Sequence, residues 1–391
     1  MNVLNIIAKK RDKKELSKEE LEFFVQGYTK GEITAAALVM AIYLNGMTNN
    51  EITNLTIAMA YSGEVLDLSK LGENVVDKHS TGGIGDKVTL ILMPIIAALG
   101  VPVAKMSGRG LGFTGGTIDK LESIPGYNTQ ISVDEFIENV EKIGISLIGQ
   151  TLNLAPADKK LYALRDSISC VENIPLIASS IMSKKIASGA NKIVLEVTVG
   201  NGAFMKNIDD AKKLAETMIN IGKLAGKETV CILTNMDEPL GYSIGNSLEV
   251  IEAVEALQGD MEDDVKQVVL ELGSYMIKLA GKGDDIEENK QRMLECLDSG
   301  LAYMKFLELI ENQGGDVSYI NDVSKFENAK FVYPVLADKS GYIKNIKSQQ
   351  LGKISCELGA GRIKKNDIIT LEITDITAEG SGVGHENGMA G

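Results

Sequence analysis

From Val75 onward, the chain passes repeatedly from a short run of β-branched residues through a glycine-rich turn into a helix-like segment. The clearest strand candidates are 101–107, 192–199 and 228–234, and 132–143 has the apolar spacing of a helix. Strands that alternate with helices are joined by crossover connections, and such connections produce a parallel sheet covered by helices. The sequence therefore predicts an α/β fold with a parallel or mixed sheet for this part of the chain.

The first 65 residues differ, because they read as helices separated by short turns. Two of these helices begin with the spacing of a capping box, Ser17 with Glu20 and Thr48 with Glu51. Helix-friendly sequence returns within the α/β region. We therefore expect a helical domain from 1–65 and 157–190, and a larger α/β domain from 70–156 and 191–315. A small C-terminal α+β unit is expected at 325–391, with an end that looks truncated.

Composition excludes several classes of protein. The 391 residues include 40 Lys and Arg against 54 Asp and Glu, a net charge of −14, which argues against a general nucleic-acid or anionic-membrane surface. Four widely separated cysteines suggest neither a disulfide framework nor a cysteine zinc site, so a reducing cytoplasm fits best. Pro94 and Pro102 interrupt the longest apolar stretch, which we interpret as a buried helix followed by a strand rather than a membrane span.

The strongest local signal is the loop DKHSTGGIGDK at 77–87, between a strand candidate and a helix that starts near Val88. Backbone N–H groups, hydroxyl groups and a helix N-terminus together can bind an anion such as phosphate. The Walker spacing GxxxxGK[ST] is absent, which argues against a nucleoside triphosphatase. The alternative is an ordinary glycine-rich turn with a solvated lysine.

A second glycine-rich segment, KMSGRGLGFTGGTIDKLE at 105–122, also follows a strand candidate. Two polar glycine loops that converge at one sheet edge make an oxyanion site more plausible than two unrelated turns. The protein as a whole is acidic, but this edge would carry a local cluster of positive charge from Lys78, Lys105 and Arg109. Arg109 could instead make a structural ion pair with Asp119, and the sequence leaves this choice open.

A third group consists of Arg165, Ser180 and Lys184. Ser180 and Lys184 are four residues apart on a predicted helix, so they face the same way. Taken singly, each of the three is most often a solvated helix residue.

The motifs together resemble a known family. The run SGRGLGFTGGTIDKLESIPGY, with DKHSTGGIGDK, ADKKLYALRD, IASSIMSKKIASGA, GAFMK and PLGYSIGNSLEV in the same order, resembles the thymidine and pyrimidine nucleoside phosphorylases over roughly residues 1–368. The resemblance implies reversible phosphorolysis of uridine, thymidine or deoxyuridine to free base and pentose 1-phosphate, in a cleft between a helical and an α/β domain. It also implies a homodimer formed through the helical domain.

The resemblance implies two sets of site residues. The phosphate set is Lys78, His79, Ser80, Thr89, Lys105, Met106, Ser107 and Thr117, and the base set is Arg165, Ser180 and Lys184. Of these, His79, Arg165 and Lys184 are the expected catalytic residues. We expect His79 to donate a proton to the base O2, because an ordinary histidine pKa of about 6.5 suits transfer near neutrality; a hydrogen-bonding role that only orients the loop is the alternative.

No organic cofactor is expected, and inorganic phosphate is the co-substrate. The resemblance also implies a structural monovalent cation, potassium, at positions that match Gly85, Lys87, Leu240, Ser243 and Glu252. Lys87 departs from the pattern, because family members often carry an uncharged residue there. Its ammonium group could compete with the ion unless it points outward.

Other departures concern Phe113, where many relatives have His, and Glu196 and Thr198, where relatives commonly carry Asp and Lys; we expect neither change to touch the phosphate set. The tail after residue 368 looks somewhat like the start of an RNA-binding TRAM domain, but a role in RNA binding is not expected.

Three alternatives for the function stay open: a thymidine-specific phosphorylase, a phosphoribosyltransferase of the anthranilate type, and an inactive protein that binds nucleoside or phosphate.

Overall fold

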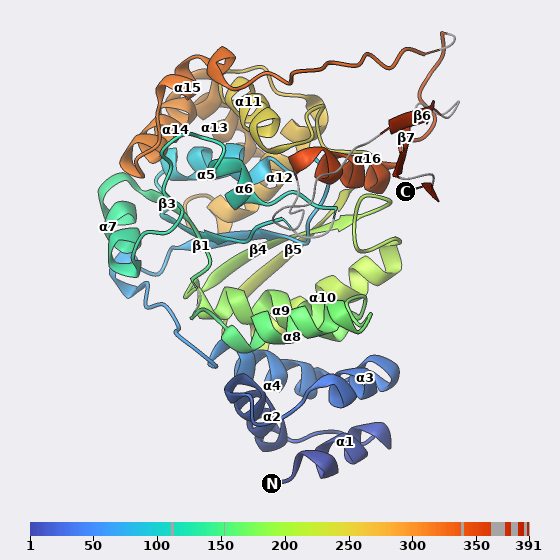
Figure 1. Cartoon of the computed structure of the whole chain (residues 1–391). Coiled ribbons are helices and arrows are strands. Elements are labelled where there is room, and N and C mark those ends of the chain that lie inside the picture. Colours follow the sequence, from blue (N-terminus) through green and yellow to red (C-terminus); the bar gives the residue numbers. More distant parts are fainter. Residues whose placement is uncertain are drawn as a thin grey trace.

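The computed structural model describes residues 1–110, 113–151, 153–337 and 340–360, and the backbone of three short strands beyond them. The N-terminal part is a bundle of four helices at one end of the molecule (Figure 1). These helices are α1 (Val3–Arg11), α2 (Lys18–Lys30), α3 (Ala36–Asn45) and α4 (Asn49–Ala60). The capping boxes predicted at Ser17 and Thr48 are both present, so α2 and α4 begin where the sequence indicates.

The predicted parallel sheet is confirmed. One part has the order β1-β4-β5, and β2 and β3 form a second parallel pair, with β1 lying beside β2. The strands are β1 (Val76–Ser80), β2 (Val103–Ser107), β3 (Ile145–Gly149), β4 (Lys192–Val199) and β5 (Glu228–Asn235). Because all pairs are parallel, the carboxyl ends of the strands meet at one edge.

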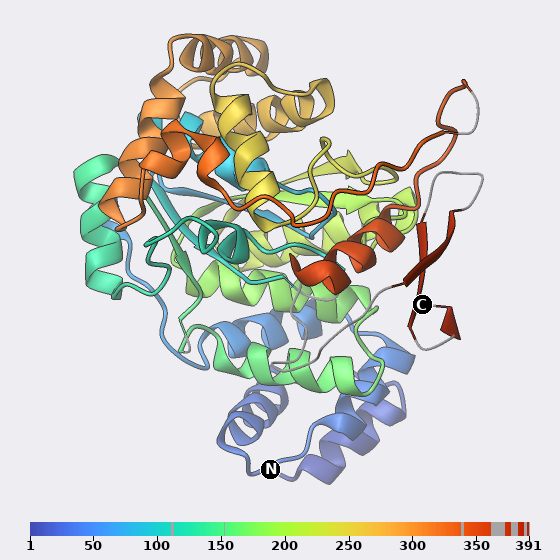
Figure 2. The ribbon, with the colours of Figure 1, turned by 45° about the horizontal axis from the view of Figure 1, so that its top comes forward.

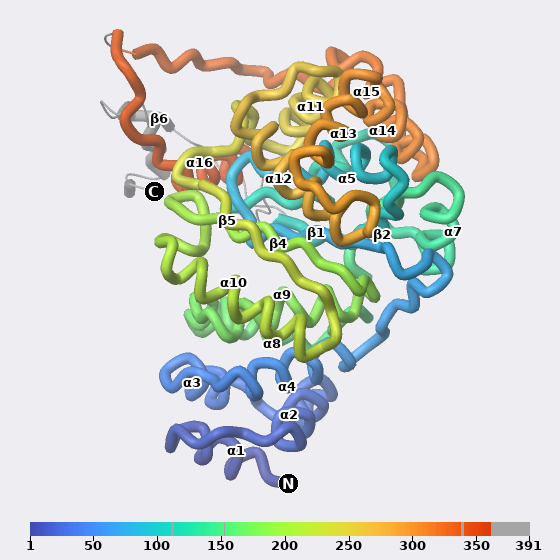
Figure 3. The backbone as a smooth tube through the Cα atoms, turned by 180° about the vertical axis from the view of Figure 1, so that it is seen from behind, coloured from blue at the N-terminus to red at the C-terminus, as the bar shows by residue number. Residues whose placement is uncertain are grey.

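Helices cover both faces of the sheet, as Figures 1 and 3 show from opposite sides. The face away from the bundle carries α5 (Val88–Ala98), α11 (Asn246–Leu257), α12 (Asp263–Leu279), α13 (Ile286–Asp298) and α14 (Leu301–Asn312). The other face carries α8 (Pro156–Ser167), α9 (Ile174–Ala187) and α10 (Ile208–Leu224). Helix α5 is almost completely buried, as expected for the apolar stretch, and among the described residues no helix is long and apolar enough to cross a membrane.

The helices that connect these layers are short or lie at the edges of the sheet. They are α6 (Thr117–Leu121), α7 (Val133–Ile143), α15 (Ser318–Asn321) and the single turns η1 (Ser69–Leu71) and η2 (Val323–Lys325). Helix α7 starts with Ser132, whose side chain accepts a hydrogen bond from the Glu135 N–H at 3.2 Å. These two residues have the spacing of a capping box, and this half of it is formed.

Helix α9 lies between the bundle and the sheet. Ile181, Met182 and Ile186 join the apolar cluster that contains Leu195 and Val197 of β4, while the same helix also packs on α4 and α10. The helix therefore brings its polar residues close to both parts of the molecule. Our assignment of 157–190 to the helical domain stays a prediction, since α9 packs against the α/β part as well.

The C-terminal part is less regular than expected for a separate α+β unit. After Phe326 the chain follows an extended, exposed course before it returns as α16 (Ser348–Ser355) and a π-helical turn, η3 (Cys356–Ala360) (Figure 2). Helix α16 packs on the first glycine loop, and a Cβ at Gly352 would lie 2.4 Å from Ile84 Cδ1. Strands β6 (Glu372–Ile376), β7 (Gly382–Glu386) and β8 (Met389–Ala390) pair antiparallel. The rest of the predicted truncated tail lies outside the described residues.

Candidate functional site

Both predicted glycine loops begin at the same edge of the sheet. Strand β1 ends at Ser80 and β2 ends at Ser107, and the two strands contact each other near these ends, with 3.3 Å between Asp77 Oδ1 and Lys105 Nζ, so their loops start close together. This edge is where open α/β sheets bind their ligands. The structure therefore brings together the part of the phosphate set that lies on β1 and β2, as predicted.

A buried cluster of three charged side chains lies inside this edge. Asp77 on β1 accepts from Lys185 on α9, at 2.7 Å between Nζ and Oδ2, and its other oxygen lies 3.3 Å from Lys105 Nζ on β2. Burial alone would raise the pKa of Asp77, but the two ammonium groups outweigh burial and lower the pKa below its usual range. Two ammonium groups thus share one carboxylate, which leaves a buried surplus of positive charge.

That surplus changes the titration of Lys105. Burial, and then the neighbouring charges of Lys185 and Lys78, lower the pKa of Lys105 from 10.5 to about 7, although Asp77 opposes this change. The Lys105 Nζ also lies 3.3 Å from the carbonyl oxygen of Met106, another member of the predicted set. Keeping Lys105 protonated costs free energy when no anion is bound. An anion at this edge would therefore be stabilised by the Lys105 ammonium group.

His79 lies in the electrostatic field of the same buried ammonium groups. Burial first, and then four ammonium groups, lower its pKa well below 6.5; the four belong to Lys185, Lys105, Lys184 and Lys78. The expectation of an ordinary histidine pKa is therefore wrong for the protein without bound anion, and the imidazole is neutral at pH 7. A neutral imidazole still carries one N–H donor, and a bound dianion would raise its pKa.

Lys78 is completely buried and pairs with Glu196 of β4, at 2.7 Å between Nζ and Oε2. Burial lowers the pKa of Lys78, but Asp86 and Glu196 outweigh burial and raise it above its usual value. The expectation that Glu196 would not touch the phosphate set is therefore wrong. Lys78 already has a carboxylate partner, so it contributes positive charge from beneath the loop.

The remaining members of the phosphate set lie around the loops. Ser80 Oγ accepts from the Gly82 N–H at 3.1 Å, Ser107 is buried at the end of β2, Thr89 lies in the first turn of α5, and Thr117 is the first residue of α6. Arg109 Nη1 lies 3.1 Å from Asp119 Oδ1, and the guanidinium group also pairs with Glu122. The structural ion pair is thus the interpretation of Arg109 that the structure supports.

Phe113 belongs to the second glycine loop, and its ring contacts a residue in the segment that follows β4. Its ring packs against Phe204, with 5.7 Å between the ring centroids, and the Lys206 ammonium lies 5.8 Å from the centroid of the Phe113 ring. The residue therefore supplies an apolar wall, as we expect from the replacement of His.

The base set lies on α8 and α9. Lys184 Nζ is 3.1 Å from Ser180 Oγ, which confirms that the two residues share one face of α9, and 2.7 Å from Oδ2 of Asp158 on α8. The Lys184 side chain is 22% exposed, whereas Asp158 is buried. Sequence reasoning missed Asp158 and Lys185, although both stand in the motifs ADKKLYALRD and IASSIMSKKIASGA; a long-range ion pair leaves no local spacing signal.

Arg165 lies at the junction of α8 and α9, where its guanidinium group contacts the backbone. Its three nitrogens donate to backbone carbonyls, Nε to Cys170 at 3.1 Å, Nη1 to Leu176 at 3.0 Å and Nη2 to Val171 at 2.6 Å. The guanidinium carbon also lies 5.6 Å from the centre of the Tyr162 ring. These contacts hold the connection between α8 and α9 and use three of the five guanidinium N–H groups, so Arg165 positions the base set. Its contact with a base carbonyl stays a prediction.

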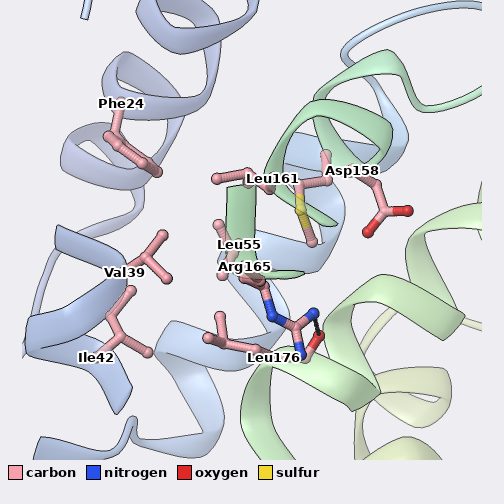
Figure 4. Close-up of a pocket in the computed structure, with 9 residues that line it drawn as sticks. Phe24, Val39, Ile42, Leu55, Asp158, Leu161, Arg165 and Leu176 are labelled. Carbon is pink, nitrogen blue, oxygen red and sulfur yellow. Dashed lines mark hydrogen bonds between the residues drawn. The ribbon is translucent and has the colours of Figure 1, made fainter. Parts of the chain in front are cut away.

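Figure 4 shows a pocket beside Arg165, inside the helical bundle. Apart from Asp158 and Arg165 its walls are apolar: Phe24, Val39, Ile42, Leu55, Met59, Leu161 and Leu176. A nucleoside needs polar partners for its sugar and base, and here the guanidinium group is directed to the Leu176 carbonyl. The pocket is therefore a packing defect of the bundle and lies apart from the glycine loops.

The five positions predicted to hold potassium do come together, but an ammonium group lies among them. Lys87 is fully buried, donates to the carbonyl oxygen of Leu240 and lies 3.0 Å from Glu252 Oε2. The Ser243 N–H donates to the same carboxylate oxygen at 2.7 Å. Because the Lys87 side chain points inward, these residues do not fit an additional monovalent cation.

Comparisons with known proteins agree with this architecture. Residues 4–63 match the family model described as "Glycosyl transferase family, helical bundle domain", and residues 72–303 match "Glycosyl transferase family, a/b domain". The crystal structure of anthranilate phosphoribosyltransferase from Thermus thermophilus superimposes with a TM-score of 0.65 at 19% identity, covering 78% of this chain and 98% of that one. This likeness shows a shared fold.

Sequence relatives are much closer. The chain is 50% identical to a pyrimidine-nucleoside phosphorylase from Geobacillus stearothermophilus and 50% identical to one from Bacillus subtilis. It is 51% identical to one from Staphylococcus haemolyticus. Each match spans 376 residues, 95% of this chain and 87% of the relative.

Proposed function

The chain belongs to the pyrimidine-nucleoside phosphorylase family of glycosyl transferases, and from that premise we propose how its residues divide the phosphorolysis of a pyrimidine nucleoside. The reaction needs phosphate and a nucleoside, and no organic cofactor. Phosphate would bind at the two glycine loops, and the base would bind at the exposed end of the Ser180 and Lys184 pair on α9. The observation that carries the proposal is that Asp77 of β1 pairs with Lys105 of the phosphate set and with Lys185, the residue next to Lys184 on α9, so the two sets lie on elements that are tied together.

The phosphate side supplies charge and hydrogen-bond donors. Lys105 is the ammonium group with the least carboxylate compensation, since it shares Asp77 with Lys185. Ser80, Ser107 and the loop N–H groups can donate to phosphate oxygens that remain. Phosphate binding would return Lys105 to its charged form and neutralise the buried surplus.

The base side stabilises the leaving group. By analogy with glycoside cleavage, positive charge grows on the sugar ring and negative charge on the departing base in the transition state. Lys184 is held by Asp158 and Ser180 while part of its side chain stays exposed, so it can approach a carbonyl of the base. The phosphate dianion stabilises the sugar ring from the opposite side.

His79 lies between the two sets in this proposal. In the absence of phosphate its imidazole is neutral, and so it would orient substrate as an N–H donor. A phosphate dianion beside it offsets the ammonium groups that depress its pKa, which makes protonation easier when both substrates are bound. Donation to the base O2 is therefore coupled to phosphate binding.

We extend the proposal to assembly and location. Leu4 of α1 and Leu44 of α3 are 68% and 72% exposed, and the two helices contact each other, which supports a homodimer formed through the bundle. None of the four cysteines, which all lie among the described residues, forms a disulfide, which supports a reducing cytoplasm.

The test measures free uracil and thymine after incubation with uridine, thymidine or deoxyuridine and phosphate, so that ribose and deoxyribose substrates are compared directly. Lys184→Ala should lower kcat/KM at least about 100-fold, roughly the effect of losing one charge-stabilising donor, while the far-UV spectrum stays that of the folded protein. The melting temperature should fall, because buried Asp158 loses its ammonium partner. Lys159→Ala, at an exposed position on the neighbouring helix α8, is the matched control and should leave kcat/KM unchanged.

The other outcomes separate the alternatives. Cleavage of thymidine alone identifies a thymidine-specific enzyme. Nucleoside binding by calorimetry without phosphate-dependent cleavage identifies an inactive binding protein. Full activity in Lys184→Ala would contradict the assignment of the base set. It would not contradict the proposal that the protein catalyses phosphorolysis.

A further inference from the structure

The first glycine loop ends in a buried ammonium group that the phosphorolysis reaction does not use. Lys87 is the last residue before α5, and its side chain turns away from the predicted phosphate edge toward the turn at 240–243. It donates to the Leu240 carbonyl oxygen and pairs with Glu252 of α11. Two parts of the chain that are 153 residues apart thus meet at one nitrogen atom.

The surroundings of this ammonium group are closely built. Glu252 accepts from the Tyr242 N–H at 3.2 Å and from the Ser243 N–H at 2.7 Å, and Leu240 N–H donates to the Ile84 carbonyl at 3.0 Å. A Cβ added at Gly241 would lie 2.7 Å from Lys87 Nζ and 1.9 Å from Glu252 Oε1. No space for a larger side chain is left beside the ion pair.

The loop itself approaches the same turn. A Cβ at Gly85 would lie 2.4 Å from the Leu240 carbonyl oxygen and 3.2 Å from that of Ser243, so only glycine lets the loop backbone come this close. Carbonyl oxygens and one carboxylate are the donor set that a hard metal cation prefers. In this chain the Leu240 carbonyl oxygen and the Glu252 carboxylate contact a covalently attached ammonium group.

The charge balance is complete. Lys87 supplies one positive charge and Glu252 one negative charge, and both are almost fully buried. A dissolved cation in the same space would meet an ammonium group a few ångströms away in a medium of low polarity, where like charges repel strongly. The site therefore accepts one cation, and the chain provides it.

We propose that the Lys87 ammonium group is a built-in monovalent cation, which holds the first glycine loop to the 240–243 turn and to α11 and makes the protein independent of dissolved potassium. Lys87 is a positioning residue, because it contacts no predicted substrate atom and acts through the loop. Its melting-temperature test requires no substrate, so it is independent of the proposed function.

The experiment compares the full-length protein in potassium chloride and in choline chloride at equal ionic strength. Choline is too large to enter the site. Wild type should have the same melting temperature, within about 1 °C, and the same kcat/KM for phosphate in both salts. A potassium-dependent rise in either quantity for wild type would overturn the proposal without any variant being made.

Two variants then convert the site. Lys87→Thr removes the ammonium group and leaves the carbonyl and carboxylate oxygens, so its melting temperature should fall by at least about 5 °C in choline and recover as potassium is added, with saturation. Lys87→Met fills the same space with an uncharged chain, so potassium should not restore it. Absence of potassium rescue in Lys87→Thr, or equal rescue in Lys87→Met, would contradict the proposal.

The kinetic readout distinguishes positioning from a general loss of stability. In Lys87→Thr without potassium we expect KM for phosphate to rise about tenfold with kcat for the folded fraction changed little, because the loop is displaced while the base set is intact. Potassium should return KM toward the wild-type value in parallel with the melting temperature. A loss confined to kcat would contradict the role assigned to Lys87.

Discussion

Two buried groups of charges flank the first glycine loop, and they differ in their balance. At its start, Asp77 is shared by the ammonium groups of Lys105 and Lys185, so positive charge exceeds negative charge. At its end, Lys87 meets one carboxylate, that of Glu252. In our proposals the first group receives an anion, whereas the second is closed and holds the backbone in place.

The comparison teaches that lysines near a glycine loop do not by themselves mark an anion site. Lys120 and Glu249 form another buried one-to-one pair at the second loop, with 2.7 Å between Nζ and Oε2. What distinguishes the Asp77 cluster is the missing second carboxylate. The number of buried carboxylates per ammonium group is therefore the quantity that separates binding from structural roles.

Removing the shared carboxylate should have the largest effect on folding. Asp77→Asn leaves Lys105 and Lys185 buried with no counterion, and loss of one partner of a buried ion pair typically costs about 3–5 kcal/mol. We expect the free energy of unfolding to fall by about 3 kcal/mol, since Lys105 can lose its proton and relieve part of the cost. Urea unfolding in phosphate-free buffer measures the change.

The control for Asp77→Asn is Asp134→Asn, which makes the same change at an exposed position in the first turn of α7. It should alter the free energy of unfolding by less than about 1 kcal/mol. A loss below about 1 kcal/mol for Asp77→Asn as well would show that the cluster carries no buried charge surplus, and the contrast with Lys87 would disappear.

The sequence predicted the parts of this architecture that depend on local signals. Capping spacing located the starts of α2 and α4, the alternation of strand and helix patterns indicated the parallel sheet, and the spacing of four put Ser180 and Lys184 on one face of α9. The glycine loops were also placed correctly at the ends of β1 and β2. Each of these features is decided by short stretches of neighbouring residues.

The features that sequence reasoning missed depend on long-range contacts. Nothing near Arg165 shows that its donors are taken by the carbonyls of the following turn, and nothing near Lys78 shows that Glu196 lies beside it. The inward direction of Lys87 likewise depends on the turn at Leu240, 153 residues later. Counterions of buried side chains come from the tertiary fold, so motifs alone do not identify them.

The titration of Lys105 gives the next prediction. The group has a pKa of about 7 without an anion, so it is fully charged well below pH 7 and loses its charge above. In the proposed site it binds phosphate when protonated. KM for phosphate, expressed as the dianion, should therefore rise with pH and approach about tenfold per unit above about pH 8. Initial rates at saturating nucleoside between about pH 6.5 and 9 measure this rise.

Lys105→Met is the matched variant for the pH profile. It removes the titrating group, so KM should be raised at all pH values and should no longer increase above about pH 7. Without bound phosphate the pKa of His79 lies well below 6.5, so His79 does not contribute to kcat/KM for phosphate in this range, because that quantity reports the free enzyme. A profile for Lys105→Met that keeps the wild-type slope would assign the titration to another group.

The smallest effect is expected at Arg109, where two carboxylates face one guanidinium group and the charges are partly exposed. Its guanidinium group pairs with Asp119 and Glu122 and its side chain is 31% exposed, so water screens the interaction. Arg109→Met keeps most of the aliphatic packing, and we expect the free energy of unfolding to fall by about 1 kcal/mol or less, with KM for phosphate within about threefold of wild type. Urea unfolding and phosphate titration of the initial rate test both values. A tenfold or larger rise in KM at unchanged stability would show that Arg109 binds the anion. The ratio of carboxylates to basic groups would then no longer distinguish anion-binding side chains from structural ones around these loops.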